Sequence, residues 1–377
     1  MTRPAAEVAR DRAASRVVAL PGYEVTVAPG ALHDAGAIIA RAAPAHHYAV
    51  VSDPNVAPLY VERVRVSLAA AAPGASMSLL LVPPGEEHKT RELWAHLTDE
   101  LLAGGAGRDT TIVALGGGVV GDLAGFVAAT YMRGVPVVQL PTTLLAMVDA
   151  SVGGKTGVDT PAGKNLVGAF HPPAAVIADP ETLASLPAPE LRSGSAEMIK
   201  HGVVADARYF DAVAAVLPRL AADDGGIPPE LTALIARSVE IKAAVVAEDE
   251  REHGRRKILN FGHTLGHAIE RASGYRLLHG EAVAIGMALE SEIAERIGVA
   301  AKGTALRVRA ALGAAGLPVV VPLGIDPPQI LAATRNDKKA RGGRVEYALP
   351  RTVGEMAGAG AGWGIHVADD VVLGVLD

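Results

Sequence analysis

Short apolar runs alternate with amphipathic segments along the first half of the chain. The runs are rich in Val, Ile and Leu and end in Gly, Pro or Asp, which is typical of buried strands. Between them lie Ala-rich segments with apolar residues at helical spacing, closed by Pro or Gly. The predicted strands lie within residues 23–30, 46–56, 77–85, 111–118, 135–143 and 174–180, and the predicted helices within 61–74 and 92–105. This alternation predicts a parallel sheet covered by helices.

The pattern changes near residue 187, where long segments with a 3.6-residue apolar repeat take over. These segments predict helices within residues 189–204, 228–250, 262–274 and 280–298. We therefore expect two domains, an α/β Rossmann-like domain with a parallel sheet over residues 1–186 and a mainly α-helical domain over residues 187–377.

Composition narrows the classes of function. Half of the 377 residues are hydrophobic, which supports packed cores, and the absence of Cys excludes thiolate metal sites and disulfides. Few aromatic residues and a net charge of -6 argue against nucleic acid or an anionic membrane as a partner. Residues 1–16 form a polar arm without an apolar core, and the chain has no uncharged apolar run of membrane-spanning length. We expect a cytoplasmic protein.

One glycine motif follows a predicted strand directly. Gly116, Gly118 and Gly121 fit the pattern G-x-G-x-x-G, in which the backbone approaches a pyrophosphate at the start of a helix. The acidic residue expected about 20 positions later is missing, and Asp53, after an earlier strand, is a better-placed partner for a ribose. A tight strand-to-helix turn without a ligand is the alternative. A second polar loop, residues 83–90, carries Glu86 and Lys89, either beside the same ligand or in a solvated turn.

Three histidines lie close together in the second half. His263 and His267 are four residues apart and share a helix face, His279 follows, and Glu197 lies on an earlier predicted helix. Imidazoles with one carboxylate suit a divalent catalytic metal. Thr264 follows the first His where a zinc protease has Glu, so peptide hydrolysis is disfavoured. Hydrogen-bonded helix histidines without a metal are the alternative.

Many basic residues stand beside Gly, Asn, Asp or His. We expect two of them, in GGKTG and AGKNLVG, to lie in loops, where a Lys next to Gly is accessible to phosphate or carboxylate. Solvated surface cations are the alternative for each. The candidates are Arg133, Lys155, Lys164, Lys200, Lys242, Arg256 and Lys338.

Taken together, these motifs resemble those of the 3-dehydroquinate synthases, within the sugar phosphate cyclases. The resemblance rests on GGGVVGDLAGFVAATYMRGV, QLPTTLLAMVDASVGGKTGVDTPAGKNLVGAFHPP, SGSAEMIKHGVV, KILNFGHTLGHAIE, LHGEAVAIGM and NDKKARGG, which occur in the family's order. It implies a lyase of the shikimate pathway. The enzyme would convert 3-deoxy-D-arabino-heptulosonate 7-phosphate to 3-dehydroquinate and phosphate. The implied steps are transient oxidation by NAD, phosphate elimination, reduction and intramolecular aldol closure.

The resemblance also implies roles for individual residues. One divalent metal, Zn or Co, would be held by Glu197, His263 and His279, with His267 on the substrate side. NAD contacts would come from Asp53, Asn55, Glu86, Lys89, Gly117, Gly118, Asp122, Thr142, Thr143, Lys155, Lys164, Thr182 and Ser185. Catalytic or substrate contacts would come from Asp149, Lys155, Asn165, Lys200, Lys242, Arg256, Asn260 and Lys338. Arg133 would reach the substrate phosphate, from the partner subunit if the enzyme is a homodimer.

Four other functions share parts of this pattern. A sister cyclase such as an aminodehydroquinate synthase would share nearly every motif. Cyclases that take sedoheptulose 7-phosphate lack a substrate carboxylate, whereas the presence here of Asn260, His263, His267 and Lys338 favours one. A metal-dependent polyol or glycerol-phosphate dehydrogenase would release NADH. A non-catalytic binding module has no need for so many cations beside a metal.

Overall fold

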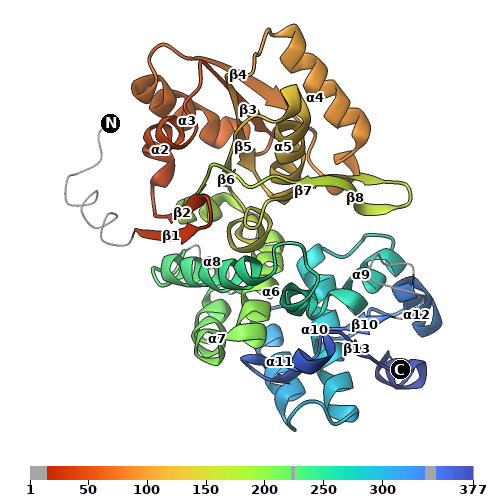
Figure 1. The fold of residues 1–377 in the computed structure, drawn as a ribbon. Helices are drawn as coiled ribbons and strands as arrows, with labels where there is room; N and C mark the ends of the chain where they lie inside the picture. The colour runs from red at the N-terminus through yellow and green to blue at the C-terminus, as the bar shows by residue number, and fades with distance from the viewer. Residues whose placement is uncertain (1–14, 222–225, 336–344, 377) are drawn as a thin grey trace. The chain divides into compact units, whose positions relative to one another are not determined.

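A computed structural model describes residues 15–221, 226–335 and 345–376 (Figure 1). Residues 1–14 of the predicted N-terminal arm and Lys338 lie outside the described residues, and Arg16, the last residue of that arm, instead begins a strand. Among the helices of the described residues, none combines the length and apolarity that a membrane crossing requires.

The described chain alternates strands and helices in its first half and is mainly helical in its second. The strands are β1 (Arg16–Leu20), β2 (Tyr23–Val27), β3 (His47–Ser52), β4 (Ser76–Leu81), β5 (Thr110–Gly116), β6 (Val137–Pro141), β7 (Lys155–Thr160), β8 (Gly163–Phe170), β9 (Ala175–Ala178), β10 (Glu346–Tyr347), β11 (Pro350–Thr352), β12 (Glu355–Met356) and β13 (Ile365–His366). The α-helices are α2 (Ala35–Ala42), α3 (Ala57–Ala71), α4 (Arg91–Ala103), α5 (Gly118–Thr130), α6 (Ala188–Ala205), α7 (Ala207–Ala221), α8 (Leu231–Glu248), α9 (His263–Ala272), α10 (His279–Arg296), α11 (Thr304–Ala314), α12 (Pro327–Arg335) and α13 (Asp369–Leu376). Short helical turns are η1 (Ala31–His33), η2 (Glu86–His88), η3 (Tyr131–Arg133), η4 (Ala146–Ala150), η5 (Pro180–Ser185), η6 (Arg255–Asn260) and η7 (Ala359–Ala361).

The chain divides into two compact units. The first contains the residues up to Leu186 together with Leu231–Val239, and the second contains Pro187–Glu230 and the residues from Glu240 onward. The first unit is built on a seven-stranded sheet with the order β1-β2-β9-β6-β5-β3-β4. All neighbours pair in parallel except β1, which pairs with β2 in antiparallel fashion. The predicted parallel sheet is therefore confirmed.

Both faces of the sheet are buried, because alternate residues of each central strand enter different cores. On β3, Ala49 and Val51 join the core under α4 and α5, whereas Tyr48 and Val50 join the core under α2 and α3. Figure 1 shows these helix pairs on opposite sides of the sheet. Double coverage explains why β5 is buried at every residue.

The prediction of loops around Lys155 and Lys164 was wrong. Lys155 begins β7, Lys164 lies in β8, and the two strands pair as an antiparallel hairpin (Figure 1). The glycines that suggested loops are needed for close pairing of these strands. A Cβ on Gly168 would lie 2.1 Å from the carbonyl oxygen of Thr156, and one on Gly157 would lie 2.7 Å from that of Val167.

The second unit is mainly helical, as predicted. Helix α10 is buried along most of its length and packs on α6, α9, α11 and α13. Its core joins Leu265 and Ile269 of α9 to Ile285, Leu289 and others of α10. Two small ladders, β10 with β13 and β11 with β12, complete the unit. This helical packing is what brings the candidate metal ligands together.

Candidate nucleotide site and candidate metal centre

The sheet of the first unit has a topological switch point between β3 and β5. From β3 the chain moves to the edge strand β4 and then returns to β5 on the other side of β3. Loops that leave the carboxyl ends of such strands diverge and open a crevice that binds nucleotides in many α/β proteins. Asp53 follows β3, and Gly117 and Gly118 follow β5. The sequence motifs therefore lie at the position where the topology favours a nucleotide.

The glycine motif forms the strand-to-helix turn that its spacing predicts. Gly116 ends β5, Gly117 is extended and precedes α5, and none of the described side chains caps this helix. The first backbone N–H groups of α5 are thus available to an anion. A Cβ on Gly117 would lie 3.0 Å from Cγ2 of Thr143, and one on Gly116 would lie 2.7 Å from Cγ2 of Val120. The glycines therefore also serve the packing of the turn.

Several predicted nucleotide contacts already shape their own loops. Oδ1 of Asp53 accepts hydrogen bonds from the backbone N–H groups of Asn55, at 2.8 Å, and Val56, at 3.2 Å, and so holds the turn that leads into α3. The hydroxyl of Thr182 donates to the carbonyl of Asp179, and Oγ of Ser185 lies 2.6 Å from the hydroxyl of Tyr60. Thr142 directly follows β6 and is buried, with Thr143 next to it.

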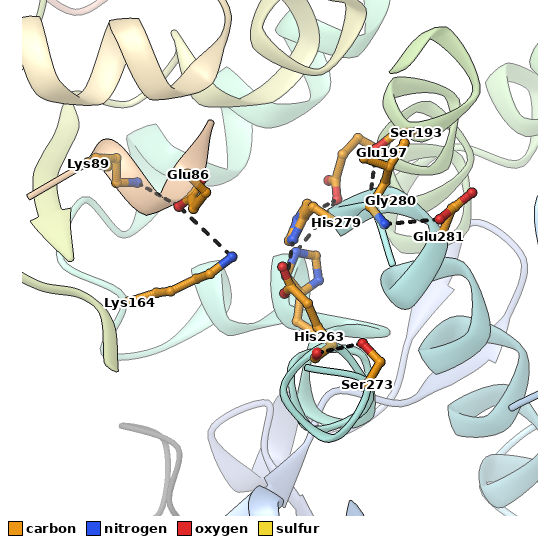
Figure 2. Close-up of polar contacts among 12 residues, drawn as sticks. Glu86, Lys89, Lys164, Ser193, Glu197, His263, Ser273, His279, Gly280 and Glu281 are labelled. Carbon is orange, nitrogen blue, oxygen red and sulfur yellow. Dashed lines mark hydrogen bonds and ion pairs between the residues drawn. The ribbon is translucent and has the colours of Figure 1, made fainter. Parts of the chain in front are cut away.

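Lys89 belongs to a charged cluster in the first unit, and Figure 2 shows its contact with Glu86. Its Nζ donates to Oδ2 of Asp122 at 2.8 Å and lies 3.2 Å from Glu86 and 4.0 Å from Asp159. Burial alone would lower the pKa of Lys89, but the three carboxylates outweigh it and raise the pKa above its ordinary value. Lys89 is therefore a buried, permanently charged link between η2, α5 and β7.

The β7–β8 hairpin carries further predicted residues. Lys155 and Asn165 are exposed, and Lys164 lies 4.0 Å from Glu86. Asn165 has φ +53°, and its backbone N–H donates to Oδ1 of Asp159 at 2.7 Å, a bond that holds the unusual conformation. Two more predicted residues lie elsewhere in this unit, with Arg133 exposed in η3 and Asp149 in η4.

The second unit brings Glu197, His263 and His279 together (Figure 2). Oε1 of Glu197 lies 3.6 Å from Nε2 of His263 and 3.9 Å from Nε2 of His279. Two ligands at about 2.0–2.1 Å from a tetrahedral Zn²⁺ stand about 3.4 Å apart, so this spacing is close to that of a metal site. Glu197 is fully buried, and neither carboxylate oxygen accepts a hydrogen bond from the described residues, although Lys200 forms an ion pair with Oε2.

Close backbone packing fixes the distance between the two helices that carry the histidines. A Cβ on Gly286 of α10 would lie 2.0 Å from the carbonyl oxygen of Gly262, directly before α9. The carboxylate of Glu290 on α10 accepts hydrogen bonds from the N–H groups of Gly262, at 2.6 Å, and Leu265, at 3.0 Å. The start of α9 is thereby joined to α10 by a backbone contact at Gly286 and by the side-chain carboxylate of Glu290.

Helix α10 is joined to α6 in a similar way. Oγ of Ser193 accepts a hydrogen bond from the N–H of Gly280 at 3.0 Å (Figure 2). A Cβ on Gly280 would lie 2.0 Å from the carbonyl oxygen of Ser193, so only glycine fits here. This contact sets the position of His279, which precedes Gly280, relative to Glu197, one turn after Ser193.

The other predicted catalytic residues of this unit are also partly or fully buried. The ring of His267 lies 5.3 Å from that of His263 and 5.9 Å from that of His279, between centroids. Lys200, Lys242 and Arg256 are buried. The N–H of Arg256 donates to Asp249, and Nδ2 of Asn260 donates to Oε1 of Glu252 at 2.6 Å.

Sequence reasoning missed the residues that support these sites. Asp159 in the first unit and Ser193, Glu270 and Glu290 in the second were not among the candidates. Glu270 was detectable, because it follows His263 and His267 by seven and three residues and so shares their helix face. Burial of Glu270 and its contact with His279, at 3.8 Å between Oε2 and Nδ1, became visible only in the structure.

We expect Gly286→Ala to destabilise the protein and weaken metal binding. The added methyl meets a backbone oxygen that cannot rotate away, and overpacking of this kind costs about 1–3 kcal/mol. Thermal unfolding and metal content after dialysis would measure both effects. Gly313→Ala is the matched control, because Gly313 is an exposed helix glycine with open space around its Cα. It should gain up to about 1 kcal/mol, and an equally stable Gly286→Ala protein would show that the contact is loose.

Comparison with known proteins connects these two sites to one family. A family model described as 3-dehydroquinate synthase N-terminal matches residues 79–193, and one described as 3-dehydroquinate synthase C-terminal matches residues 194–340. The 3-dehydroquinate synthase of Symbiobacterium thermophilum is 48% identical over 336 residues, which cover 89% of this chain and 92% of that relative.

Solved structures agree with this placement. A 2-deoxy-scyllo-inosose synthase complexed with carbaglucose-6-phosphate, NAD⁺ and Co²⁺ matches with a TM-score of 0.86 and 27% identity, over 96% of this chain and 99% of that one. A 2-epi-5-epi-valiolone synthase from Streptomyces hygroscopicus with NAD⁺ and Zn²⁺ bound matches with a TM-score of 0.82 and 31% identity, over 96% and 98% of the two chains.

Proposed function

The chain belongs to the 3-dehydroquinate synthase family, and we propose on this premise that its two candidate sites hold NAD and one divalent metal. The enzyme converts 3-deoxy-D-arabino-heptulosonate 7-phosphate to 3-dehydroquinate and phosphate in the shikimate pathway. In class it is a lyase that eliminates phosphate and closes a carbocycle. We also propose that the enzyme depends on both cofactors, that the residues named below hold them, and that it works as a soluble homodimer in the cytoplasm.

The donor set of the second unit fits a metal. A fully buried carboxylate is costly unless a cation compensates it, and Lys200 accounts for Oε2 of Glu197 while Oε1 faces two imidazole nitrogens. Two His and one Glu leave a coordination position open for substrate oxygens and suit Zn²⁺ or Co²⁺. We therefore assign the metal to Glu197, His263 and His279.

The switch point of the first unit fits a dinucleotide. The uncapped start of α5 would meet the pyrophosphate, and Asp53 would meet a ribose. Asn55, Glu86, Lys89, Asp122 and the Thr142–Thr143 pair belong to loops or helix starts that follow β3, β4, β5 and β6. We assign NAD to this edge of the sheet, and we propose that the two compact units are the NAD-binding and the metal-binding domains.

When bound, the NAD supplies reversible hydride acceptance and the metal supplies a Lewis acid for substrate oxygens. The chain's own residues bind the substrate's two anionic groups. Lys155, Arg256 and Lys338 are assigned to the phosphate and carboxylate, because Lys and Arg side chains form charge-assisted hydrogen bonds with such groups. Arg133 would add a cation to the phosphate from the partner subunit.

His267 is assigned to proton transfer on the substrate side. A neutral imidazole can accept a proton at one nitrogen while the other donates a hydrogen bond, and its ordinary pKa lies near physiological pH. Lys200, next to Glu197 on α6, holds positive charge at this centre in a buried position. Lys242, Asn260, Asp149 and Asn165 are assigned to orienting substrate hydroxyl groups.

The observation that carries the proposal is the buried carboxylate of Glu197 facing two imidazoles on rigidly packed helices. The test incubates the purified protein with 3-deoxy-arabino-heptulosonate 7-phosphate and trace NAD, with and without chelator. Chelator-sensitive release of phosphate with 3-dehydroquinate as the product, many turnovers per NAD and no accumulation of NADH is the expected result. Turnover only of the amino analogue or of sedoheptulose 7-phosphate would assign a sister cyclase. Accumulating NADH would indicate a dehydrogenase.

We expect Lys155→Ala to raise the KM for the substrate about 10-fold or more while NAD affinity changes little. The ammonium is exposed at the start of β7, and losing one charge-assisted hydrogen bond costs about 1.5–3 kcal/mol. Steady-state kinetics and NAD titration would separate the two effects. Lys302→Ala removes another exposed Lys, which has no assigned role. If the KM for the substrate is as little changed in Lys155→Ala as in this control, Lys155 is a surface cation with no role in binding the substrate.

A further inference from the structure

The ring of His279 lies between two buried carboxylates. Its Nε2 faces Oε1 of Glu197 at 3.9 Å, and its Nδ1 faces Oε2 of Glu270 at 3.8 Å. Glu270 lies on α9 and is only 5% exposed. None of the roles assigned above uses this second carboxylate.

The two nitrogens of a metal-binding imidazole have different tasks. The nitrogen that binds the metal must present its lone pair, so the proton of the neutral ring sits on the other nitrogen and needs an acceptor. His263 already shows this division, because its Nδ1 lies 3.1 Å from the carbonyl oxygen of Phe261 while its Nε2 faces Glu197. His279 starts α10, and Glu270 occupies the position of an acceptor for its Nδ1.

The position of Glu270 also follows from the packing of α9. Glu270 is seven residues after His263 and three after His267, so the three side chains share one face of the helix. The glycine contacts described above bring this face against the start of α10. A buried carboxylate is stable only with a partner, and Oε2 of Glu270 lies 3.8 Å from Nδ1 of His279.

We propose that Glu270 is a positioning residue, which holds the proton of His279 on Nδ1 and directs Nε2 to the metal. The inference rests on the proposed metal site. The present 3.8 Å separation is an ion-pair distance, and such contacts commonly shorten when the site is filled. Carboxylates of this kind raise the basicity of the ligand and fix the orientation of the ring.

The test measures metal affinity directly on the full-length protein stripped of metal. Co²⁺ is titrated into wild type and Glu270→Gln, with a chelating indicator as competitor, and the visible absorption of the bound Co²⁺ is recorded. Gln keeps the shape of the side chain but not its charge, and loss of such a partner weakens metal binding about 10–100-fold. We expect this weakening with a shifted Co²⁺ spectrum, while the far-UV circular dichroism spectrum stays that of wild type.

Glu281→Gln is the matched control. Glu281 lies two residues after His279 on α10, and Oε2 accepts the N–H of Leu278 at 2.9 Å (Figure 2). The substitution removes a carboxylate charge close to the metal site without removing a partner of the His279 ring. The Co²⁺ affinity should therefore stay within about twofold of wild type, a much smaller change than the loss expected for a histidine partner. If both variants lose the same Co²⁺ affinity, the effect of Glu270 comes from its negative charge in general and not from its contact with His279, and the inference is overturned.

The remaining outcomes separate the inference from the function beneath it. If wild type binds Co²⁺ and Glu270→Gln binds it with the same affinity, the positioning role of Glu270 is overturned but the metal site is not. Complete loss of binding in Glu270→Gln would make Glu270 a ligand, within the group of His267, Glu270 and His279, and overturns it too. Wild type that binds no Co²⁺ overturns both the metal site and the inference.

Discussion

His263→Ala loses the metal and the activity together. The substitution removes the imidazole whose Nε2 lies 3.6 Å from Oε1 of Glu197 and leaves two protein ligands, too few for a stable catalytic site. A metal ion contributes several kcal/mol to stabilising developing charge, so turnover should fall by about 1000-fold or more. Metal content after dialysis and phosphate release under saturating substrate are the two measurements.

His96→Ala provides the control for this prediction. His96 lies on α4 with its side chain 65% exposed, so its loss removes an imidazole without affecting a metal site. It should retain wild-type metal content and turnover. An active His263→Ala protein with full metal content would remove His263 from the ligand set.

Lys89→Met should cause the largest loss of stability in the first unit. It leaves Glu86, Asp122 and Asp159 facing one another without the buried cation that now compensates them. Removing one partner of a buried ion pair costs about 3–5 kcal/mol. The chain has two Trp residues, so in a Trp363→Phe background Trp94 reports on the first unit, where it packs on Phe126. Its fluorescence during denaturant unfolding measures the change.

Lys164→Met makes the same change of charge at a more exposed position. Lys164 is 31% exposed and 4.0 Å from Glu86, so its loss should cost no more than about 1 kcal/mol. An equal loss of stability in the two variants would show that burial of Lys89 does not govern its contribution.

Most of the sheet was predictable because its strands carry their pattern locally. The middle of β3 (residues 49–51) and of β5 (residues 112–115) is a continuous apolar run, as burial on both faces demands, and each strand is followed by turn residues. The β7–β8 hairpin was not predictable in this way. Its glycines resemble loop residues, and only the pairing partner reveals that Gly157 and Gly168 are there because two backbones meet.

The candidate sites were likewise predictable from the sequence only in part. Helical spacing alone puts His263 and His267 on one face, and the glycine motif alone predicts the turn before α5. Neither pattern indicates that Glu197 is within 4 Å of two imidazoles, because Glu197 is 66 and 82 positions away in sequence from His263 and His279. Packing at Gly286, Gly280 and Ser193 decides that distance.

The sequence by itself determined the class of fold, the family, the cations available for an anionic substrate and the residue types that could hold a metal. Those properties depend on local periodicity and on the order of motifs along the chain, which can be recognised without knowing which residues are in contact. Tertiary structure alone decided which side chains come into contact. Two examples are Lys89, a buried charge among three carboxylates, and Glu270, whose carboxylate faces Nδ1 of His279. Such contacts depend on how separate elements pack, since burial and charge pairing are properties of neighbours in space and not of neighbours along the chain.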